Sequence, residues 1–262
     1  MKEQGGNLFK TDAITLRSYN YGENDRIVTL FSDELGMVQA IAKGARKIKS
    51  RLMGATLPFC EGNYLLYKGR SLCTITQFEF KRAYKNISDN MSNLLCAEYM
   101  AELTLKTGSE YYDRRLYRLL QEGLGCLENG CCGPELLEWA FALRVMDING
   151  VLPNLDCCTR CGEDIKGAAW FSAAAGGVLC GACRGAYADS FAIGRATLSA
   201  CSYIMRHSFE DLGIINLSKD TEREINGIVR SCVSYYISQD IKTADLLNVQ
   251  VLKKNRGNEG KE

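Results

Sequence analysis

The sequence predicts an α+β protein, with an N-terminal five-stranded barrel followed by an all-helical domain into which a four-cysteine zinc module is inserted. Three observations predict this architecture. Apolar residues alternate with a period of two in the first third of the chain, recur with a helical period from about residue 88, and are interrupted there by two Cys-x2-Cys pairs. The domains are expected at residues 1–82 and 83–252, with the insertion at about 153–188 and a disordered tail at 253–262.

The N-terminal third contains five short alternating segments that predict strands. Turns that contain glycine separate them, and this pattern fits a small closed barrel. The five-stranded OB-fold is the commonest barrel of this kind that binds oligonucleotides, and other small barrels remain alternatives. The predicted strands are 10–19, 26–32, 36–43, 63–68 and 72–80.

A basic segment follows the third predicted strand. No Asp or Glu occurs between Leu35 and Cys60, yet five cations occur there within nine residues. They are Lys43, Arg46, Lys47, Lys49 and Arg51. Like charges at this density favour contact with a polyanion, and the phosphates of DNA are the obvious one. The alternatives are a solvated surface loop and a DNA path over the helix that carries Arg114, Arg115 and Arg118.

Aromatic and acidic residues of the N-terminal third are further candidates for function. Four tyrosines could stack on unpaired bases, although each is interpreted first as a barrel core residue. They are Tyr19, Tyr21, Tyr64 and Tyr67. Glu23 and Asp25 flank a turn and are interpreted as turn residues; a metal-dependent hydrolase that uses both is the alternative.

The cysteine pattern predicts a metal site. Cys158, Cys161, Cys180 and Cys183 form two Cys-x2-Cys pairs with eighteen residues between them, a spacing typical of zinc. Four thiolates fill the tetrahedron of Zn²⁺ and leave no position for water, so one structural ion per chain is expected. Two disulfides or four unrelated thiols are the alternatives, and Cys157 could take the place of Cys158.

The rest of the chain reads as five helices. The first begins near Ser88, the second ends at Asn129-Gly130, and Pro134 opens the third. The last two are expected at 194–207 and about 220–239. Thr221 and Glu224 are placed as a capping box for the last helix.

Composition restricts the class of protein. The net charge is +1, so any affinity for nucleic acid must be local. The N-terminus lacks the apolar run of a signal peptide, and no stretch approaches the roughly 18 apolar residues of a membrane span. We therefore expect a cytoplasmic protein with reduced thiols and no membrane contact. His207, the one histidine, has no catalytic partners in sequence, and there is no phosphate-binding loop, so no enzyme is expected.

The chain resembles the RecO family of DNA repair proteins over nearly its whole length. Motifs of the N-terminal third carry most of the resemblance: Leu16-Arg17, Tyr21-Gly22-Glu23-Asn24-Asp25-Arg26, Thr29-Leu30-Phe31, Leu35-Gly36, Ala42-Lys43-Gly44-Ala45-Arg46, Ser50-Arg51-Leu52, Leu57-Pro58-Phe59 and Gly69-Arg70-Ser71-Leu72. The zinc segment is similar at Pro153, Leu155, Cys158, Cys161-Gly162, Phe171, Gly176-Gly177, Cys180 and Cys183. Residues 242–247 resemble the closing motif of the family, with Thr for Ser and Leu for the aromatic residue.

The resemblance implies an N-terminal OB-fold, a helical domain with a structural zinc, and no catalysis. It implies binding of single- and double-stranded DNA, annealing of complementary strands, and help for RecA in replacing single-strand-binding protein. The implied partners are RecR, the C-terminal tail of single-strand-binding protein and, indirectly, RecF and RecA, with a cytoplasmic, nucleoid-associated location. The alternative is a zinc-containing adaptor that binds proteins and has no DNA contact.

Overall fold

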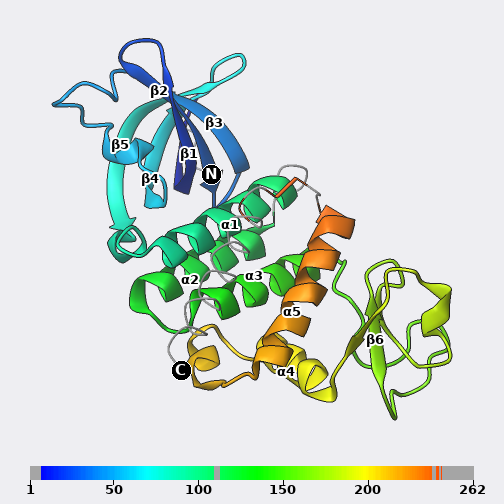
Figure 1. Cartoon of the computed structure of the whole chain (residues 1–262). Helices are drawn as coiled ribbons and strands as arrows, with labels where there is room; N and C mark the ends of the chain where they lie inside the picture. Colours follow the sequence, from blue (N-terminus) through cyan, green and yellow to red (C-terminus); the bar gives the residue numbers. More distant parts are fainter. Residues whose placement is uncertain (1–6, 109–112, 238–239, 242, 244–262) are drawn as a thin grey trace. The chain divides into compact units, whose positions relative to one another are not determined.

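The computed structural model of the protein describes residues 7–108, 113–237, 240–241 and 243 (Figure 1). The chain forms two compact units. The first comprises residues 1–87 and 108–128, and the second comprises residues 88–107 and 129–262. The predicted tail at 253–262 lies outside the described residues, as does most of the closing motif at 242–247.

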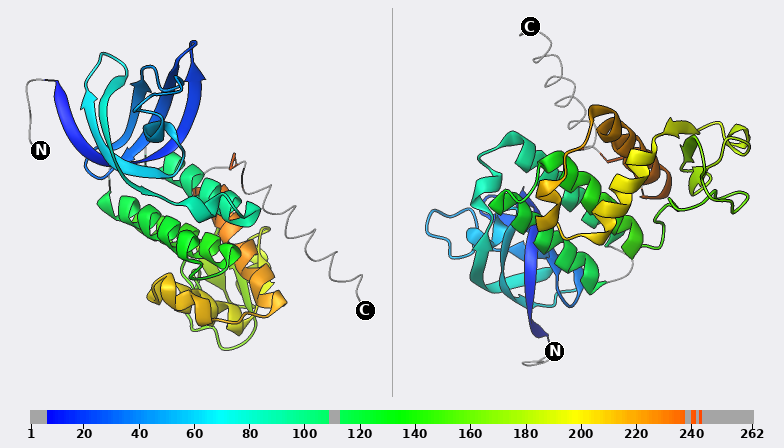
Figure 2. Two further views of the ribbon diagram at one scale, coloured as in Figure 1. Left: turned by 90° about the vertical axis from the view of Figure 1, so that its left-hand side faces the viewer. Right: turned by 90° about the horizontal axis from the view of Figure 1, so that it is seen from below.

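The first unit contains a closed five-stranded barrel, which Figures 1 and 2 show from three sides. Around the barrel the strands are ordered β1-β2-β3-β5-β4, and β4 pairs again with β1. Every neighbouring pair is antiparallel except β3 and β5, as in the Greek-key barrel of an OB-fold. The five predicted strands are thereby confirmed. Their bounds are β1 Leu8–Tyr21, β2 Asp25–Ser32, β3 Gly36–Ala42, β4 Cys60–Tyr67 and β5 Cys73–Ala83.

Alanines, aliphatic side chains and one tyrosine fill the barrel. Alanines at several inward positions let the strands close tightly around Tyr64, whose side chain is fully buried. Its hydroxyl lies 2.8 Å from Thr15 Oγ1, and Thr15 donates to the carbonyl of Ala55 at 2.9 Å. The polar atoms of this core are therefore satisfied inside it.

Helix α2 (Arg114–Asn129) packs on the barrel within the first unit. The ring of Tyr117 lies 5.8 Å from that of Phe31, and Arg114 forms an ion pair with Asp33. The sequence assigns α2 to the predicted helical domain, which begins after residue 82, but this helix packs with the barrel. The domain boundary at residues 82/83 stays a prediction.

The second unit is built on four helices. They are α1 Met91–Thr107, α3 Pro134–Ile148, α4 Arg195–Arg206 and α5 Lys219–Cys232. Helix α3 packs against the other three, as Figure 1 shows. Short helical turns complete the chain at η1 Gly54–Thr56, η2 Lys85–Ile87, η3 Arg184–Ala186, η4 Glu210–Ile214 and η5 Val233–Ile237. Among the described residues, every helix is too short or too polar to cross a lipid bilayer.

The start of α5 corrects one prediction. The N-cap is Ser218, whose Oγ accepts from the backbone N–H of Thr221 at 3.2 Å. Thr221 already lies inside the helix, so the predicted capping box of Thr221 and Glu224 is wrong. The Glu224 carboxylate instead accepts from Gly194 N at 2.7 Å and from the Thr197 hydroxyl, at the start of α4.

In the sequence, a small β module that contains the four cysteines follows α3 and precedes α4. Its three strands are β6 Ala169–Ser172, β7 Gly177–Leu179 and β8 Phe191–Ile193, in the order β7-β6-β8. Gly177 has φ +151°, and a Cβ there would lie 2.1 Å from the carbonyl oxygen of Asn154. Only glycine fits where these two segments meet.

Candidate nucleic-acid interface and metal centre

The basic segment forms the first half of the long connection between β3 and β4, residues 43–59. Its start is fixed to the β1–β2 turn. Asp25 Oδ1 accepts from Gly44 N at 2.7 Å, Asn24 O accepts from Arg46 N at 3.0 Å, and Arg46 Nη1 donates to Gly22 O at 3.1 Å. Gly44 makes this close approach with a left-handed φ of +67°.

Two buried alanines anchor this connection to the barrel core. Ala45, within the charged stretch, and Ala55, after it, both belong to the core cluster. The carbonyl of Ala55 also accepts from Thr15 and from Tyr64. The charged stretch is therefore a constrained projection from the barrel.

All five predicted cations are exposed. None of them makes an ion pair with another described residue. The alternative set on α2 differs, because Arg114 pairs with Asp33 and Arg115 pairs with Asp113. Positive charge that is not held in an ion pair can neutralise phosphate, so the geometry favours the segment 43–51 over Arg114 and Arg115 of α2 as a phosphate contact.

The tyrosines divide into two classes. Tyr64 is a core residue, as interpreted. The same interpretation is wrong for Tyr19, Tyr21 and Tyr67, which are 52%, 53% and 44% exposed. A bulge in β1 between Thr15 and Arg17 reverses the alternation, so that Tyr19 and Tyr21 point outward.

The acidic pair beside the β1–β2 turn has a structural use. Asp25 holds the backbone of Gly44, and Glu23 is exposed. Within the part of the chain that the structure describes, no cluster of metal-binding type includes either carboxylate. The interpretation as turn residues thus agrees with the geometry better than a hydrolase site does.

Sequence reasoning did not single out Lys68 and Arg70 as candidates. Both are exposed in the β4–β5 turn, 25 and more residues away from Lys43 in sequence. The parallel pairing of Ile41 with Thr74 brings β5, and hence this turn, beside the strand that leads into the basic segment. In the sequence these residues appear only as a glycine turn with two cations. The pairing of β3 with β5, which places this turn near the basic segment, is not visible in the sequence.

The four predicted cysteines come together in the β module. Their sulfur atoms all lie within 4.8 Å of one another, and those of Cys161 and Cys180 are 3.9 Å apart. Four thiolates bound to one Zn²⁺ at about 2.3 Å would be about 3.8 Å apart, so the donor set fits a tetrahedral thiophilic ion. Cys157 lies outside the group, and its Sγ accepts from Asn154 Nδ2 at 3.5 Å.

The electrostatics of the group favour a cation. Burial opposes ionisation of Cys158, but the N–H groups of Cys180, Cys161 and Arg160 outweigh it and lower the pKa of this thiol to about 6. A hydrogen bond shared with Cys180 is the main cause that raises the pKa of Cys183 to about 12. One sulfur is thus ready to bind metal at neutral pH, while its neighbour needs the metal in order to ionise.

The cysteine loops are also held by contacts within the module. Gly162 donates to the carbonyl of Cys158 at 2.8 Å with φ +75°, which closes the first loop. The guanidinium of Arg184 lies over the ring of Trp170, 4.4 Å from the ring centre. The strands of the module bury Phe171, Val178 and Leu179 fully.

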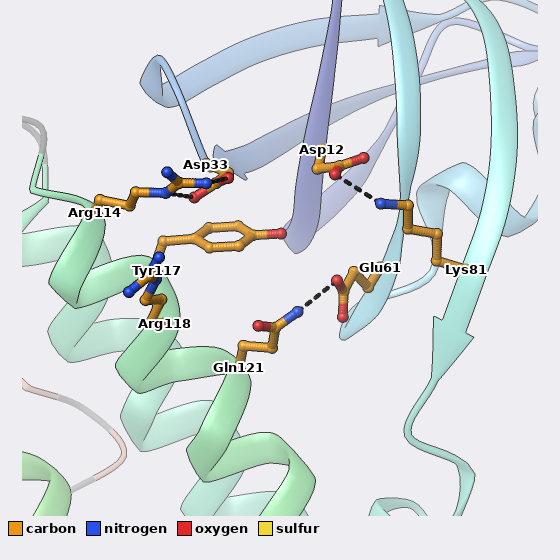
Figure 3. A pocket seen from close by; sticks show the side chains of 8 residues that line it. All are labelled: Asp12, Asp33, Glu61, Lys81, Arg114, Tyr117, Arg118 and Gln121. Carbon is orange, nitrogen blue, oxygen red and sulfur yellow. Dashed lines mark hydrogen bonds and ion pairs between the residues drawn. The ribbon is translucent and has the colours of Figure 1, made fainter.

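A polar cavity of about 170 Å³ lies between α2 and the barrel (Figure 3). Its acidic side chains are paired: Asp33 with Arg114 at 2.6 Å, Asp12 with Lys81 at 2.6 Å, and Glu61 with Gln121 at 2.7 Å. The buried Tyr117 hydroxyl points among them without a hydrogen-bond partner in the described residues. Burial, and then the nearby carboxylates, raise the pKa of Tyr117, so the hydroxyl stays protonated. We interpret the pairs of Arg114 and Gln121 as the attachment of α2 to the barrel, whereas the pair of Asp12 and Lys81 joins β1 to β5.

Comparisons with known proteins cover both units. A family model described as "Recombination protein O N terminal" matches residues 7–84, and one described as "Recombination protein O C terminal" matches residues 88–245. The chain is 32% identical over 244 residues to the DNA repair protein RecO of Thermoanaerobacter sp. (strain X514), which covers 92% of this chain and 97% of that protein. It is 38% identical over 193 residues to the DNA repair protein RecO of Rubrobacter xylanophilus, which covers 73% and 78% of the two chains.

Proposed function

The chain belongs to the RecO family, and from that premise we propose that it is a DNA repair and recombination mediator that binds DNA without sequence specificity and anneals complementary single strands. One observation carries the proposal: from a fixed position beside its β1–β2 turn, the barrel projects five exposed cations that form no ion pair with any described residue.

Annealing follows from charge neutralisation. Two strands repel each other through their phosphates, and bound cations reduce that repulsion so that complementary bases can pair. Phosphates carry no base identity, so contacts to them bind any sequence. Lys43, Arg46, Lys47, Lys49 and Arg51 are assigned this contact with single- and double-stranded DNA.

The four-cysteine group is assigned one structural Zn²⁺ per chain, held by Cys158, Cys161, Cys180 and Cys183. All four positions of a tetrahedral ion would be filled by protein, so the ion would hold the module together and activate no water. We infer accordingly that the protein is not an enzyme, and that it neither cleaves DNA nor hydrolyses ATP.

The proposed partners come from the family. They are RecR, the C-terminal tail of single-strand-binding protein and, indirectly, RecF and RecA, in the cytoplasm at the nucleoid. In this role the protein would help RecA to replace single-strand-binding protein on gapped DNA. Annealing of complementary oligonucleotides coated with that protein tests the role as a whole.

Salt dependence of DNA binding tests the assigned cations. Each phosphate neutralised on a single strand contributes about −0.7 to the slope of log affinity against log salt. Combined replacement of Lys43, Arg46 and Lys47 by Gln is therefore expected to flatten the slope by about 2. The matched control replaces Lys166, Arg195 and Lys219, which are also exposed but lie in the helical unit.

Annealing should decline together with binding in the first triple variant and be unchanged in the control. Equal slopes for the parent and the first variant would place the DNA path elsewhere on the molecule. Absence of DNA binding by the parent would favour the alternative, an adaptor that binds only proteins.

A further inference from the structure

A row of side chains crosses the outer surface of the barrel. Residues directly opposite each other in a sheet project from the same face. Tyr19 pairs with Ile27 and Ile27 with Ile41; Ile41 pairs with Thr74 across the parallel strands, and Thr74 with Tyr67. We call Tyr19, Ile27, Ile41, Thr74 and Tyr67 the outer row.

The positions next to the outer row confirm its orientation. Val28, Ala40, Leu66 and Ile75 each adjoin a member of the row in sequence, and all four belong to the barrel core. Since successive residues of a strand point to opposite faces, the row faces outward. Adjacent strands lie about 4.8 Å apart, so the row extends about 19 Å around the surface.

The outer row has an apolar centre and exposed aromatic ends. Ile27 is only 6% exposed although it points outward, so neighbouring side chains must cover it, and its direct cross-strand neighbours are Tyr19 and Ile41. Tyr19 and Tyr67 at the two ends remain about half exposed, and Tyr21 lies two residues beyond Tyr19 on the same face.

Cations stand next to the outer row. Lys43 comes directly after β3, two residues beyond Ile41, while Lys68 and Arg70 follow Tyr67. The face of strands two and three, with the loops between strands one and two and between strands four and five, is where OB-folds bind oligonucleotides. Phosphate contacts and aromatic surfaces thus lie side by side.

We propose that the outer row is a base-stacking surface for unpaired DNA, with Tyr19 and Tyr67 each stacking on a base. The proposal rests on the proposed function, because the loop cations hold the backbone of the same strand. In a duplex the base faces are already stacked on each other, whereas its phosphates remain accessible. The outer row therefore favours single strands over duplexes, whereas the cations bind the phosphates of both.

Three probes of equal length separate stacking from charge: a thymidine oligonucleotide, a strand made of abasic sites, and a duplex. Tyr19→Ala and Tyr67→Ala are each expected to weaken binding of the thymidine strand by roughly 5- to 150-fold. Binding of the abasic strand and of the duplex should not change. Tyr19→Phe and Tyr67→Phe keep the ring and should bind like the parent, and so should Tyr235→Ala, which removes a tyrosine that is 60% exposed in the helical unit.

Two results would overturn the stacking proposal and leave the loop proposal intact. One is a parent protein that binds the abasic and thymidine strands equally well. The other is a Tyr19→Ala, Tyr67→Ala double variant that loses no affinity for thymidine, or loses it equally for all three probes. Equal loss accompanied by a lower melting temperature would assign these rings to stability. A parent that binds none of the probes would instead contradict the proposed function itself.

Discussion

The barrel and the cysteine module are both small β structures, and they are stabilised by different means. The barrel encloses a continuous core of ten buried residues around Tyr64. The module has three strands of three or four residues, which bury Phe171, Val178 and Leu179, and its loops bring four cysteine sulfurs within 4.8 Å of one another. The barrel should therefore fold without an ion, whereas the module should depend on one. Because each region has its own source of stability, each can be perturbed separately.

Removal of one cysteine should have the largest effect. Cys158→Ser is expected to abolish metal binding, which contributes on the order of 10 kcal/mol in structural zinc sites. Elemental analysis should find about one zinc per parent chain and none in the variant, and limited proteolysis should then cut within residues 153–188 while the barrel resists.

The adjacent Cys157→Ser is the matched control, and it should keep the metal. Loss of metal from Cys157→Ser but not from Cys158→Ser would mean that the wrong cysteine has been assigned. If the parent protein is free of metal after purification under reducing conditions, the module does not depend on an ion for its stability.

Metal affinity should fall steeply on acidification. The N–H of Glu163 lowers the pKa of the Cys161 thiol, but its shared hydrogen bonds, first with Cys158, outweigh this and raise it. With the pKa of Cys183 at about 12, both thiols hold protons at pH 7 and must release them to bind metal. Affinity should therefore change by at least about 100-fold per pH unit near pH 7. Competition with a chelator at several pH values measures this, and a flat profile would contradict thiolate ligation.

Two glycines allow a matched perturbation of the two regions. In Gly177→Ala the new Cβ would meet Asn154 O at 2.1 Å, and in Gly62→Ala it would meet Phe78 Cε2 at 2.2 Å. Each should cost about 1–3 kcal/mol, but only the first should weaken metal binding and only the second should lower barrel stability. Gly185→Ala, with no atom near the new Cβ, is the neutral control. If each variant changes both metal binding and barrel stability, the stabilities of the barrel and of the module are coupled.

The smallest effect concerns the attachment of the basic segment. Asp25→Ala removes the acceptor for Gly44 N and should lower stability by about 1 kcal/mol. Removal of a negative charge alone would increase affinity for DNA. If the position of the segment matters more than net charge, the variant should instead bind DNA several-fold more weakly, as fluorescence anisotropy can measure. Tighter binding would show that net charge dominates.

The sequence is informative where a local pattern determines a local structure. The alternation of β2 and β3, the proline and glycine at the ends of α3, and the Cys-x2-Cys loops all give their structures directly. The four sulfur ligands could be assigned because two short loops of fixed geometry need only be brought together. The exposed cations were likewise predictable, since a segment without acids has no internal partner.

Other features depend on contacts that no local pattern encodes. The amphipathic pattern of α2 predicts that one face is buried, but it does not reveal that Tyr117 packs on the barrel. The bulge at Thr15 and Arg17 has no distinct signature, yet it decides that Tyr19 and Tyr21 point outward. Glu224 also matched a capping pattern, and a tertiary contact with α4 took its carboxylate instead.

Closure of the barrel has a consequence for how partners can attach. Strands β2 and β4 are paired with a neighbour on both sides along their length, whereas β3 and β5 pair with each other only at Ala40–Cys73 and Ile41–Thr74. A partner therefore cannot extend the sheet by adding a β-strand at β2 or β4, and growth into an aggregate by that route is blocked there. Recognition at β2 and β4 must use side chains and loops, where single substitutions can adjust it without disturbing the hydrogen-bond ladder.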